Sequence, residues 1–435
     1  MKLNYKLNIK GPHTHILEVE IRGAKPKNIK YLDFFLPSWS PGSYLMREYA
    51  KNIKKFEAFD KKGDVLFYQQ IDKGTWRVSW GQEETSDNSF NISYNIYCHE
   101  LTVRTSHIDD SHAFIHGPSV LMSIVDIDIE KPVIEINFPS HWAKVSTGLE
   151  DISKNRDQFV YTAKNYDELI DSPIEIGNHE TDGFLLGEKE HFLAFYGIPL
   201  PHSRDLKSDI KKIVTLISDT LGEIPYDKYT FITHFIPGKY GGLEHLNSTA
   251  LQFDAFSLQD RKKYINWLSL VAHEYFHTWN VKRIRPKGLG PFDYRTEANT
   301  SLLWLAEGLT SFMDELFVFR SDLIDLNEYL DLQKKNLERY FDTPGRKFHS
   351  LEQSSFNAWN KLYRPDENSL NSSISYYLKG GIAFFVLNVL LKNEGRGIDD
   401  FIQELWKDYK KDPSVGIENE FIFQLVEKLG GVEVR

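Results

Sequence analysis

Two histidines and a glutamate in the run H-E-x-x-H at residues 273–277 form the group with the clearest chemical potential in this chain. His273 and His277 are four residues apart, which on an α-helix is just over one turn, so both imidazoles project from one face. That spacing lets two ring nitrogens bind a single metal ion. Glu274 lies beside them, where its carboxylate can accept a proton from a water activated by the metal. The pattern therefore predicts a hydrolytic metal centre, provided that the segment is helical.

The segment 262–279 is predicted to be that helix. It contains no Gly or Pro, and its apolar residues recur at helical spacing. A buried charge without a partner is costly, so a carboxylate and two imidazoles in a largely apolar helix indicate a metal, a cleft or an ion pair.

A third metal ligand is needed, because a catalytic zinc usually has three protein ligands and one open position. Glu307 is the candidate, since it is a lone acid among leucines in a second apolar segment, 300–319. The alternative is an ordinary surface glutamate, which the preceding motif disfavours. Two imidazoles and one carboxylate favour Zn²⁺ over manganese or cobalt. We therefore expect one zinc ion per chain, held by His273, His277 and Glu307.

Several short motifs give these residues a family resemblance. H-E-x-x-H followed by W-L-x-E-G resembles the gluzincin metallopeptidases, which include the aminopeptidase N-like enzymes. The residues of these motifs are most similar to those of the glycyl aminopeptidase family of gluzincins. The matching runs include L-P-S-W-S-P-G-S-Y at 36–44, G-G-L-E-H at 241–245, N-V-K-R-I-R-P at 280–286 and Y-Y-L-K-G at 376–380. The resemblance extends from near the N-terminus to about residue 395. Such proteins commonly continue into a C-terminal PDZ domain, for which a chain ending at Arg435 has no room, so we expect a short or truncated form.

The resemblance also implies roles for residues outside the metal site. Glu244 would hold the free α-ammonium of the substrate, whereas its alternative is a surface ion pair. Gly241 and Gly242 would leave space for the substrate backbone beside this segment. Tyr377 would stabilise the tetrahedral intermediate, and we choose it over Tyr376 because it occupies the first position of Y-x-K-G.

The implied function is a zinc-dependent aminopeptidase that hydrolyses the N-terminal peptide bond of peptides with a free N-terminus. Glu274 would act as general base, and the resemblance implies a preference for small N-terminal residues such as Gly and Ala. Two alternatives stay open. One is a zinc endopeptidase of the same fold, in which Glu244 has no pairing role. The other is a catalytically weak gluzincin that serves as a scaffold, which the presence of all three ligands, the base and the tyrosine disfavours.

Composition indicates a globular enzyme of ordinary kind. The net charge of −10 and the pI of about 5.9 argue against nucleic acid or an anionic membrane as the main partner. The single cysteine, Cys98, excludes an intramolecular disulfide framework. The N-terminus lacks the apolar segment of a signal peptide, and no run of 18 apolar residues is evident, so we expect a cytoplasmic protein without membrane insertion.

The predicted fold class is α+β and multidomain. Apolar and polar residues alternate at 17–21, 90–96 and 134–138, which predicts half-buried strands in an N-terminal β-rich domain, 1–180. An apolar stripe at helical spacing over 206–221 indicates a helix that ends at Gly222. By resemblance, the N-terminal domain is β-sandwich-like, residues 181–325 form a thermolysin-like zinc catalytic domain, and residues 326–435 form a helical domain that contributes Tyr377.

A second metal site is not expected. The histidines outside the motif, including His107 and His112, show no partner spacing and are predicted to be surface or hydrogen-bonded polar residues. His234 and His245 flank the segment of Glu244, where a second metal is disfavoured. Ser311, one helical turn beyond Glu307, is a candidate hydrogen-bond partner for a ligand imidazole.

Overall fold

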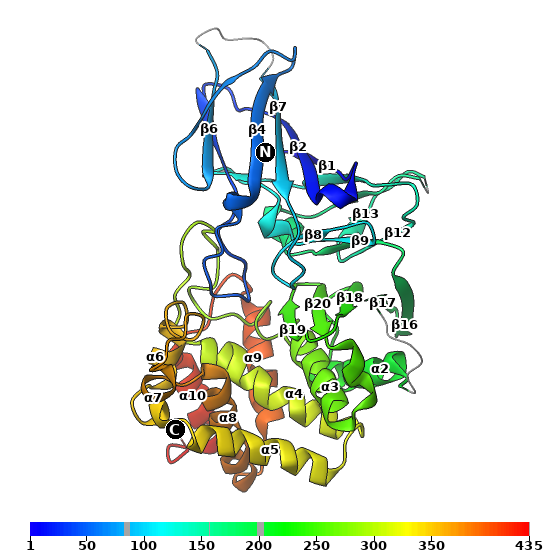
Figure 1. Ribbon diagram of the computed structural model, residues 1–435. Coiled ribbons are helices and arrows are strands. Elements are labelled where there is room, and N and C mark those ends of the chain that lie inside the picture. Colours follow the sequence, from blue (N-terminus) through cyan, green and yellow to red (C-terminus); the bar gives the residue numbers. More distant parts are fainter. Residues whose placement is uncertain (82–87, 156, 198–203, 435) are drawn as a thin grey trace.

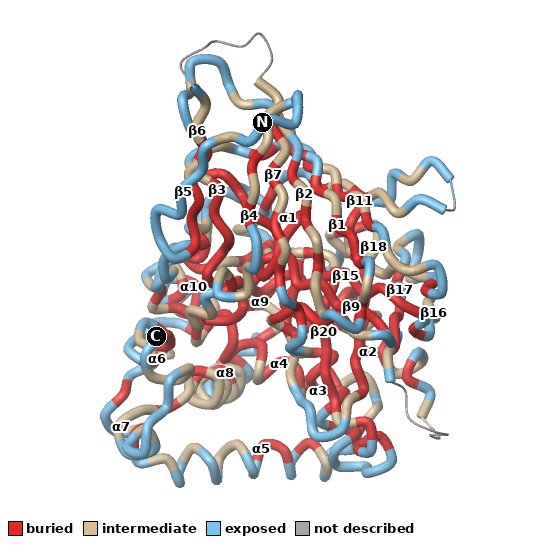
Figure 2. Tube along the Cα trace, turned by 45° about the horizontal axis from the view of Figure 1, so that its top comes forward, coloured by how far each residue is buried: buried red, intermediate tan, exposed pale blue. Residues whose placement is uncertain are grey.

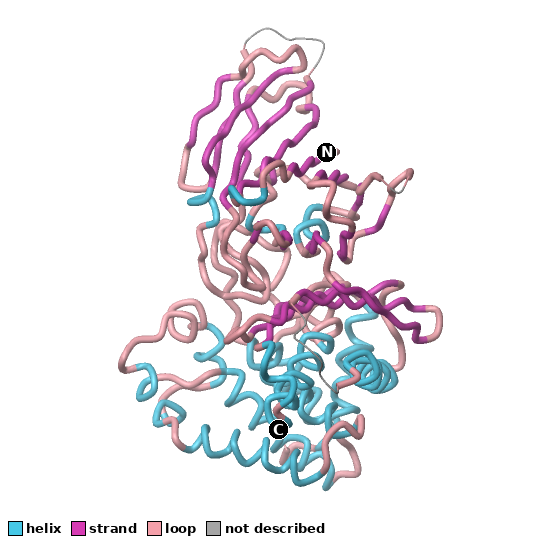
Figure 3. Tube along the Cα trace, turned by 45° about the vertical axis from the view of Figure 1, so that its right-hand side comes forward, coloured by secondary structure: helices cyan, strands magenta, loops and turns pink. Residues whose placement is uncertain are grey.

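The computed structural model describes residues 1–81, 88–155, 157–197 and 204–434. Strands are concentrated in the N-terminal part and helices in the C-terminal part, with a further sheet between the two (Figure 1; Figure 3). The N-terminus lies at the β-rich end and the C-terminus at the helical end. This arrangement confirms the predicted α+β multidomain class.

Within the described part of the chain, the residues up to Gly177 form three sheets. The alternating segments predicted at 17–21 and 90–96 are neighbouring antiparallel strands, with the apolar side chains of both buried on one face. The first sheet has the order β13 (Glu150–Asp151), β14 (Val160–Thr162), β11 (Val133–Asn137), β1 (Asn4–Asn8), β2 (Ile16–Ala24), β7 (Ser89–Tyr97) and β4 (Ile53–Asp60). The second has β10 (Ser123–Ile124), β3 (Tyr31–Phe35), β6 (Thr75–Ser79) and β5 (Phe67–Gln70), and the third has β12 (Lys144–Thr147), β15 (Ile174–Gly177), β9 (His112–Ile115) and β8 (His107–Ile108).

A further sheet carries one side of the candidate site. Its described strands run in the order β16 (Glu180–Leu186), β17 (Lys189–Tyr196), β18 (Lys228–Phe235), β20 (Ser248–Phe253) and β19 (Gly241–Glu244). Strand β19 pairs only with β20 in this sheet and forms its edge. Helices α2 (Leu206–Leu221) and α3 (Arg261–Phe276) lie beside the sheet, and Gly222 ends α2 at φ 81°, as predicted.

Helices make up most of the remaining chain. A π-helical turn, η5 (Trp304–Gly308), leads into α4 (Leu309–Arg320), and α5 (Leu326–Phe341) lies along the outer edge with an exposed face (Figure 2). The others are α1 (Tyr166–Ile170) in the β-rich part and then α6 (Leu351–Phe356), α7 (Ser369–Ser372), α8 (Tyr376–Asn393), α9 (Ile398–Lys411) and α10 (Asn419–Gly430).

One stretch qualifies the expectation that the chain has no membrane-spanning run. Among the described residues, Ser369–Asn393 is long and apolar enough, by length and composition, to cross a membrane, although 28% of its most apolar window is buried in the molecule. The stretch includes α8, which packs against η5 and α4.

We propose the domain boundaries 1–180, 181–325 and 326–435. They are supported by the change of sheet between the end of β15 at Gly177 and the start of β16 at Glu180. The helical region after the glutamate-bearing helix begins with α5 at Leu326, where Asp325 forms a capping box with Glu328.

The β-rich part is joined to the segments that follow β19 and α3 by a largely buried ion pair. The Asp171 carboxylate accepts hydrogen bonds from Lys282 Nζ at 2.8 Å, from His245 Nδ1 at 3.1 Å and from the Leu246 amide at 2.8 Å. Arg283, next in the basic run, donates to the carbonyls of Leu246, Thr278 and Pro225. The basic run 280–286 therefore anchors backbone rather than forming a surface patch.

Replacing Asp171→Asn is expected to lower the free energy of unfolding by about 3 kcal/mol, because it leaves the Lys282 ammonium buried without a counter-charge. Urea denaturation would measure this. The double variant Asp171→Asn with Lys282→Met serves as control and is expected to recover much of the loss. Burial acts to raise the pKa of Asp171, but Lys282 and His245 outweigh it and lower the pKa from 3.8 to about 2. The stabilisation is therefore present above pH 4 and lost as the pH falls through about 2. Equal stability of wild type and Asp171→Asn at pH 7 would contradict the assignment.

Candidate active site

Helix α3 presents the H-E-x-x-H residues to a cleft. The Asp260 side chain caps its N-terminus by accepting from the Lys263 amide at 2.9 Å, and apolar residues bury most of the helix surface. His273 and Glu274 lie in its last turn, and His277 follows as the C-cap residue with helical backbone angles. The helix predicted over 262–279 is thus confirmed, with its regular part ending three residues earlier.

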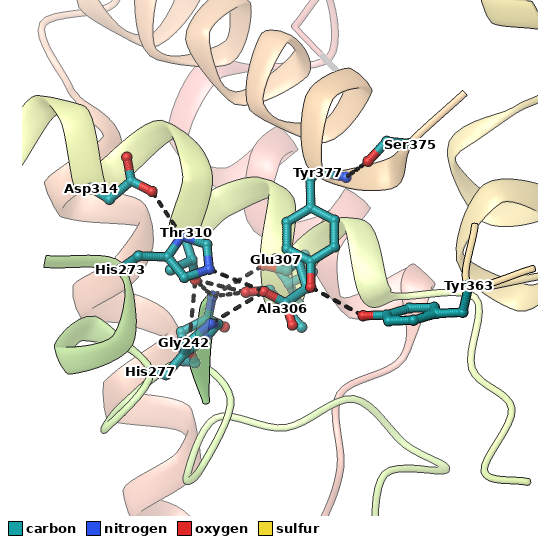
Figure 4. A network of polar contacts seen from close by, with 12 residues as sticks. Gly242, His273, His277, Ala306, Glu307, Thr310, Asp314, Tyr363, Ser375 and Tyr377 are labelled. Atoms are coloured by element: carbon teal, nitrogen blue, oxygen red, sulfur yellow. Dashed lines mark hydrogen bonds and ion pairs between the residues drawn. The ribbon is translucent and has the colours of Figure 1, made fainter. Parts of the chain in front are cut away.

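The three predicted ligands converge at one point, as Figure 4 shows. The Nε2 atoms of His273 and His277 lie 3.3 and 3.2 Å from Glu307 Oε2. Ligand atoms about 2.1 Å from a shared tetrahedral ion would be separated by roughly 3.4 Å, so the spacing of this donor set suits Zn²⁺. Glu307 reaches the site from η5, which lies within the second predicted segment, 300–319.

Two further residues orient the imidazoles. His273 Nδ1 hydrogen-bonds Asp314 Oδ2 at 2.7 Å, and His277 Nδ1 hydrogen-bonds the Asn280 carbonyl at 2.5 Å, which leaves both Nε2 atoms facing Glu307. This is the supporting arrangement found around metal-ligating histidines. Ser311 lines the cleft, but the partner of His273 is Asp314. Asp314 lies seven residues after Glu307, and this two-turn spacing on one helix face is the signal that could have identified it.

Charge in the cleft is strongly shaped by burial. Burial acts to raise the pKa of Glu307, but His277 and His273 outweigh it and lower the pKa to about 2, so this residue is a carboxylate. Burial raises the pKa of Glu274 to about 7, against the opposing effect of the two imidazoles. Glu244 is buried as well, and one atom each of Glu244, Glu274 and His277 lie within 4.8 Å of one another. Several buried acidic groups thus lie close together in the wall of one cleft.

Helix α8 brings a tyrosine to this space through close backbone packing. A Cβ at Gly308 would lie 2.6 Å from the Cα of Gly380, so the two helices can touch only because both residues are glycine. Tyr377 then lines the cleft, with its ring 6.2 Å from that of His273 and its hydroxyl 3.4 Å from that of Tyr363 (Figure 4). Tyr376 is fully buried in an aromatic cluster instead.

The edge strand β19 forms the opposite wall. Gly241 and Gly242 line the cleft, and a Cβ on Gly242 would lie 2.0 Å from Glu274 Oε1. The Gly242 carbonyl accepts a hydrogen bond from Arg104 Nη2 at 3.0 Å, so a side chain of the β-rich part fixes this strand. Glu244 ends the strand with its side chain at the cleft, and its Oε1 has no hydrogen-bond partner among the described residues.

A loop from the β-rich part packs against Glu244 at the cleft. Gly42 has φ 81°, and a Cβ there would lie 2.5 Å from Glu244 Oε2. Gly42 and Arg104 both line the cleft. Sequence reasoning missed these two residues, although the run at 36–44 belonged to the family resemblance and could have indicated a role beyond packing.

The cleft that unites these walls has a volume of about 620 Å³, which suits a peptide or other small molecule. It extends from Gly42 and Glu244 past the histidines to α5. At that far end Gln333 and Asn336 donate hydrogen bonds to the carboxylate of Glu315, at distances of 2.6 to 3.2 Å. Glu244 and its neighbours therefore line the same cleft as the three predicted ligands.

A sheet, an H-E-x-x-H helix and a glutamate-bearing helix arranged around one cleft define a metallopeptidase. Comparison with known families agrees. The Peptidase M61 N-terminal domain matches residues 4–178, and the M61 glycyl aminopeptidase domain matches residues 266–383. The chain belongs to the M61 peptidase family.

Solved structures show the same architecture. An aminopeptidase N family protein from Idiomarina loihiensis is 29% identical, with a TM-score of 0.92 over 99% of this chain and 74% of that chain. An M1 zinc metallopeptidase variant from Deinococcus radiodurans, bound to a Tyr-Ser-Ala substrate, is 14% identical, with a TM-score of 0.59 over 100% of this chain and 91% of that one. Native yeast LTA4 hydrolase is also 14% identical, with a TM-score of 0.58 over 100% of this chain and 66% of that one. The last two likenesses concern the fold. No curated protein sequence matches the chain.

The contact between Gly242 and Glu274 leads to a prediction. Gly242→Ala is expected to lower kcat about 100-fold, because the new methyl group must displace the Glu274 carboxylate by an ångström or more. The matched control is Gly241→Ala, whose Cβ would meet nothing closer than 3.8 Å and should leave kcat near the wild-type value. Steady-state kinetics on a glycyl p-nitroanilide, together with metal analysis of both variants, would test this. Equal rates for the two variants would show that the carboxylate position is unimportant.

Proposed function

We propose that this chain is a zinc-dependent aminopeptidase that removes the N-terminal residue of peptides. His273, His277 and Glu307 would hold one zinc ion, and Glu274 and Tyr377 would act on the scissile bond. The observation that carries the proposal is the buried carboxylate of Glu244, which is 4% exposed and lies in the same cleft as the ligand residues. A buried anion in a cleft that can hold a peptide calls for a cation there, and the free α-ammonium of a peptide would supply one.

The spacing of the acidic groups supports exopeptidase action. Glu244 and Glu274 have carboxylate oxygens within 4.8 Å of each other. In an amino acid residue, the α-nitrogen is roughly 2.5 Å from its own carbonyl carbon, from the standard bond lengths. An ammonium bound by Glu244 therefore places the first peptide bond, and no later one, beside Glu274.

Bound zinc supplies a Lewis acid that polarises the scissile carbonyl and lowers the pKa of water. Glu274 would take the proton from the attacking water and then transfer it to the departing amine. Gly242 allows this carboxylate to lie directly against the edge strand, so the base is held beside the substrate backbone. Asp314 and Asn280 keep the imidazoles in the orientation that ligation requires.

Tyr377 would donate a hydrogen bond to the carbonyl oxygen as negative charge develops there. Its place in the cleft lining, beside the ring of His273, supports this role over one for Tyr376. Burial raises the pKa of Tyr377 well above its usual value, so the hydroxyl keeps its proton for donation.

A preference for glycine or alanine at the N-terminus is also proposed. One support is the match to the glycyl aminopeptidase domain. The other is the close contact of Gly42 with Glu244, which limits the space for a side chain beside this carboxylate. Peptides with a free N-terminus are the proposed substrates, and the cytoplasmic location stays a prediction.

The decisive experiment compares glycyl and alanyl p-nitroanilides with their N-acetylated forms, with and without a chelator and added zinc. Cleavage of the free-amine substrates alone, lost on chelation and restored by zinc, is the expected result. In Glu244→Gln, kcat/KM for the free-amine substrates should fall about 100-fold, since a buried charge-assisted contact is removed. Cleavage of the acetylated forms by the wild type would identify an endopeptidase, and no cleavage of either would favour a scaffold.

A second pair of variants tests the tyrosine assignment. Tyr377→Phe is expected to lower kcat by roughly 100- to 1,000-fold with a smaller change in KM, because the lost hydrogen bond forms fully only in the transition state. Tyr376→Phe removes a hydroxyl from the neighbouring buried ring and should retain most of the activity. Steady-state kinetics on alanyl p-nitroanilide would measure both. A reversed order of the two effects would transfer the role to Tyr376.

A further inference from the structure

A second group of metal-ligating side chains lies outside the cleft, on the hairpin formed by β8 and β9. His107, Asp109 and His112 each offer one ligand atom, and these atoms lie within 4.8 Å of one another. We propose that they bind a second divalent transition-metal ion, such as Zn²⁺, that is independent of the catalytic site. None of the three lines the cleft, so the proposal does not depend on the proposed function.

His112 has the hydrogen bonding of a metal ligand. The residue is completely buried, and its Nδ1 lies 2.8 Å from Glu175 Oε1. A metal-ligating histidine commonly binds a carboxylate through one ring nitrogen and the metal through the other, so Nε2 is the nitrogen available to an ion. Among the described residues, Nε2 is buried and has no hydrogen-bond partner. A buried polar atom without a partner is costly, and a metal ion at this position would supply one.

His107 and Asp109 complete the set of donors. His107 is 7% exposed, so its imidazole lies inside the hairpin region rather than in solvent. Its Nε2 lies 3.0 Å from Asp109 Oδ2. Asp109 Oδ1 accepts from the amide and hydroxyl of Ser111 at 2.8 and 2.5 Å, which orients Oδ2 toward His107. The Asp109 side chain is 34% exposed, so the ion could enter from solvent and retain water as a further ligand.

A neighbouring set of the same residue types, His112, Glu175 and His234, is better explained as support for this site. Glu175 accepts from His112 Nδ1 and from His234 Nε2 through separate oxygens, at 2.8 and 2.9 Å. All three side chains are 1% exposed, so these atoms are closed to solvent and to an entering ion. Glu175 instead fixes the orientation of the His112 ring.

The supporting residues connect the hairpin with the catalytic sheet. His112 lies on β9, Glu175 on the adjacent strand β15, and His234 on β18, an inner strand of the sheet that ends in the cleft wall β19. The ring of Tyr196, on β17, stacks on His112 at 3.6 Å. An ion bound at the hairpin would therefore stabilise the packing of the β-rich part on the catalytic sheet. The sequence indicated surface or hydrogen-bonded polar residues at His107 and His112, and both are buried and hydrogen-bonded, to Asp109 and Glu175, because the hairpin and β15 bring these residues together.

Two imidazoles and one carboxylate with open positions favour Zn²⁺ or a similar transition metal over calcium or magnesium, which prefer all-oxygen sites. The chain would then bind two ions, one in the cleft and one at the hairpin.

The test removes two ligands of the cleft site and measures how many zinc ions the chain still binds. A full-length variant with His273→Ala and His277→Ala, freed of metal, is titrated with ZnCl₂ by isothermal calorimetry. One equivalent of zinc is expected to bind, and the melting temperature should rise with zinc. Adding His107→Gln and Asp109→Asn to this variant should weaken binding at least about 100-fold and abolish the thermal shift, whereas Glu175→Gln should weaken binding about 10- to 100-fold. His13→Gln, at an exposed histidine, is the matched control and should change neither quantity.

Each result decides the proposal. Circular dichroism establishes that the variants are folded, and the visible spectrum of bound Co²⁺ reports nitrogen ligation directly. If the parent variant binds no zinc, or if His107→Gln with Asp109→Asn binds it as tightly as the parent, the hairpin is not a metal site. Peptidase activity of the wild-type protein is measured separately, so failure of the second site leaves the catalytic proposal untouched, and the reverse also holds.

Discussion

Four buried acidic side chains gather around one cleft, and the arrangement of the surrounding elements follows from this constraint. Glu244, Glu274, Glu307 and Asp314 are each less than 10% exposed. Isolated buried charges are costly, so these acidic groups need counter-charges. The imidazoles lie beside Glu307, and a divalent cation beside Glu307 and a substrate ammonium beside Glu244 would supply further positive charge. The cost of bringing the acidic groups together would thus be recovered as affinity for the metal and for the charged end of a peptide.

Close backbone packing makes this concentration of charge possible. Gly308 and Gly380 allow α8 to touch η5, and Gly242 allows the carboxylate of Glu274 to lie against the edge strand. A methyl group at any of these positions would separate walls that need to be in contact. The positions of the chemical groups are therefore set by where side chains are missing as much as by where they are present.

The sequence predicted what depends on local spacing. Histidines four residues apart, the alternating residues of β2 and β7, and the helix ended by Gly222 follow from the periods of helix and strand, which are properties of neighbouring residues. The sequence did not indicate which residues far apart in the chain come into contact. Gly42 meets Glu244 across some 200 residues of chain, and His112 meets His234 through a strand, β15, that no periodic pattern had indicated. Asp314 could have been predicted from its two-turn spacing from Glu307. The sequence instead favoured Ser311, one turn from Glu307, as the hydrogen-bond partner of a ligand imidazole.

The edge strand β19 shows why the β-rich part belongs to the catalytic unit. An edge strand has one unpaired side and is easily displaced. Here Arg104 donates to the Gly242 carbonyl, Gly42 packs on the Glu244 carboxylate, and Asp171 accepts from the Leu246 amide just beyond the strand. All three contacts come from the first 180 residues. The strand that would recognise the substrate N-terminus is thus held in place by the β-rich part, whereas the predicted metal ligands come from the end of α3 and from η5. Glu244 itself belongs, like these ligands, to residues 181–325, so the β-rich part would contribute to binding of a free amine by fixing the strand that carries Glu244.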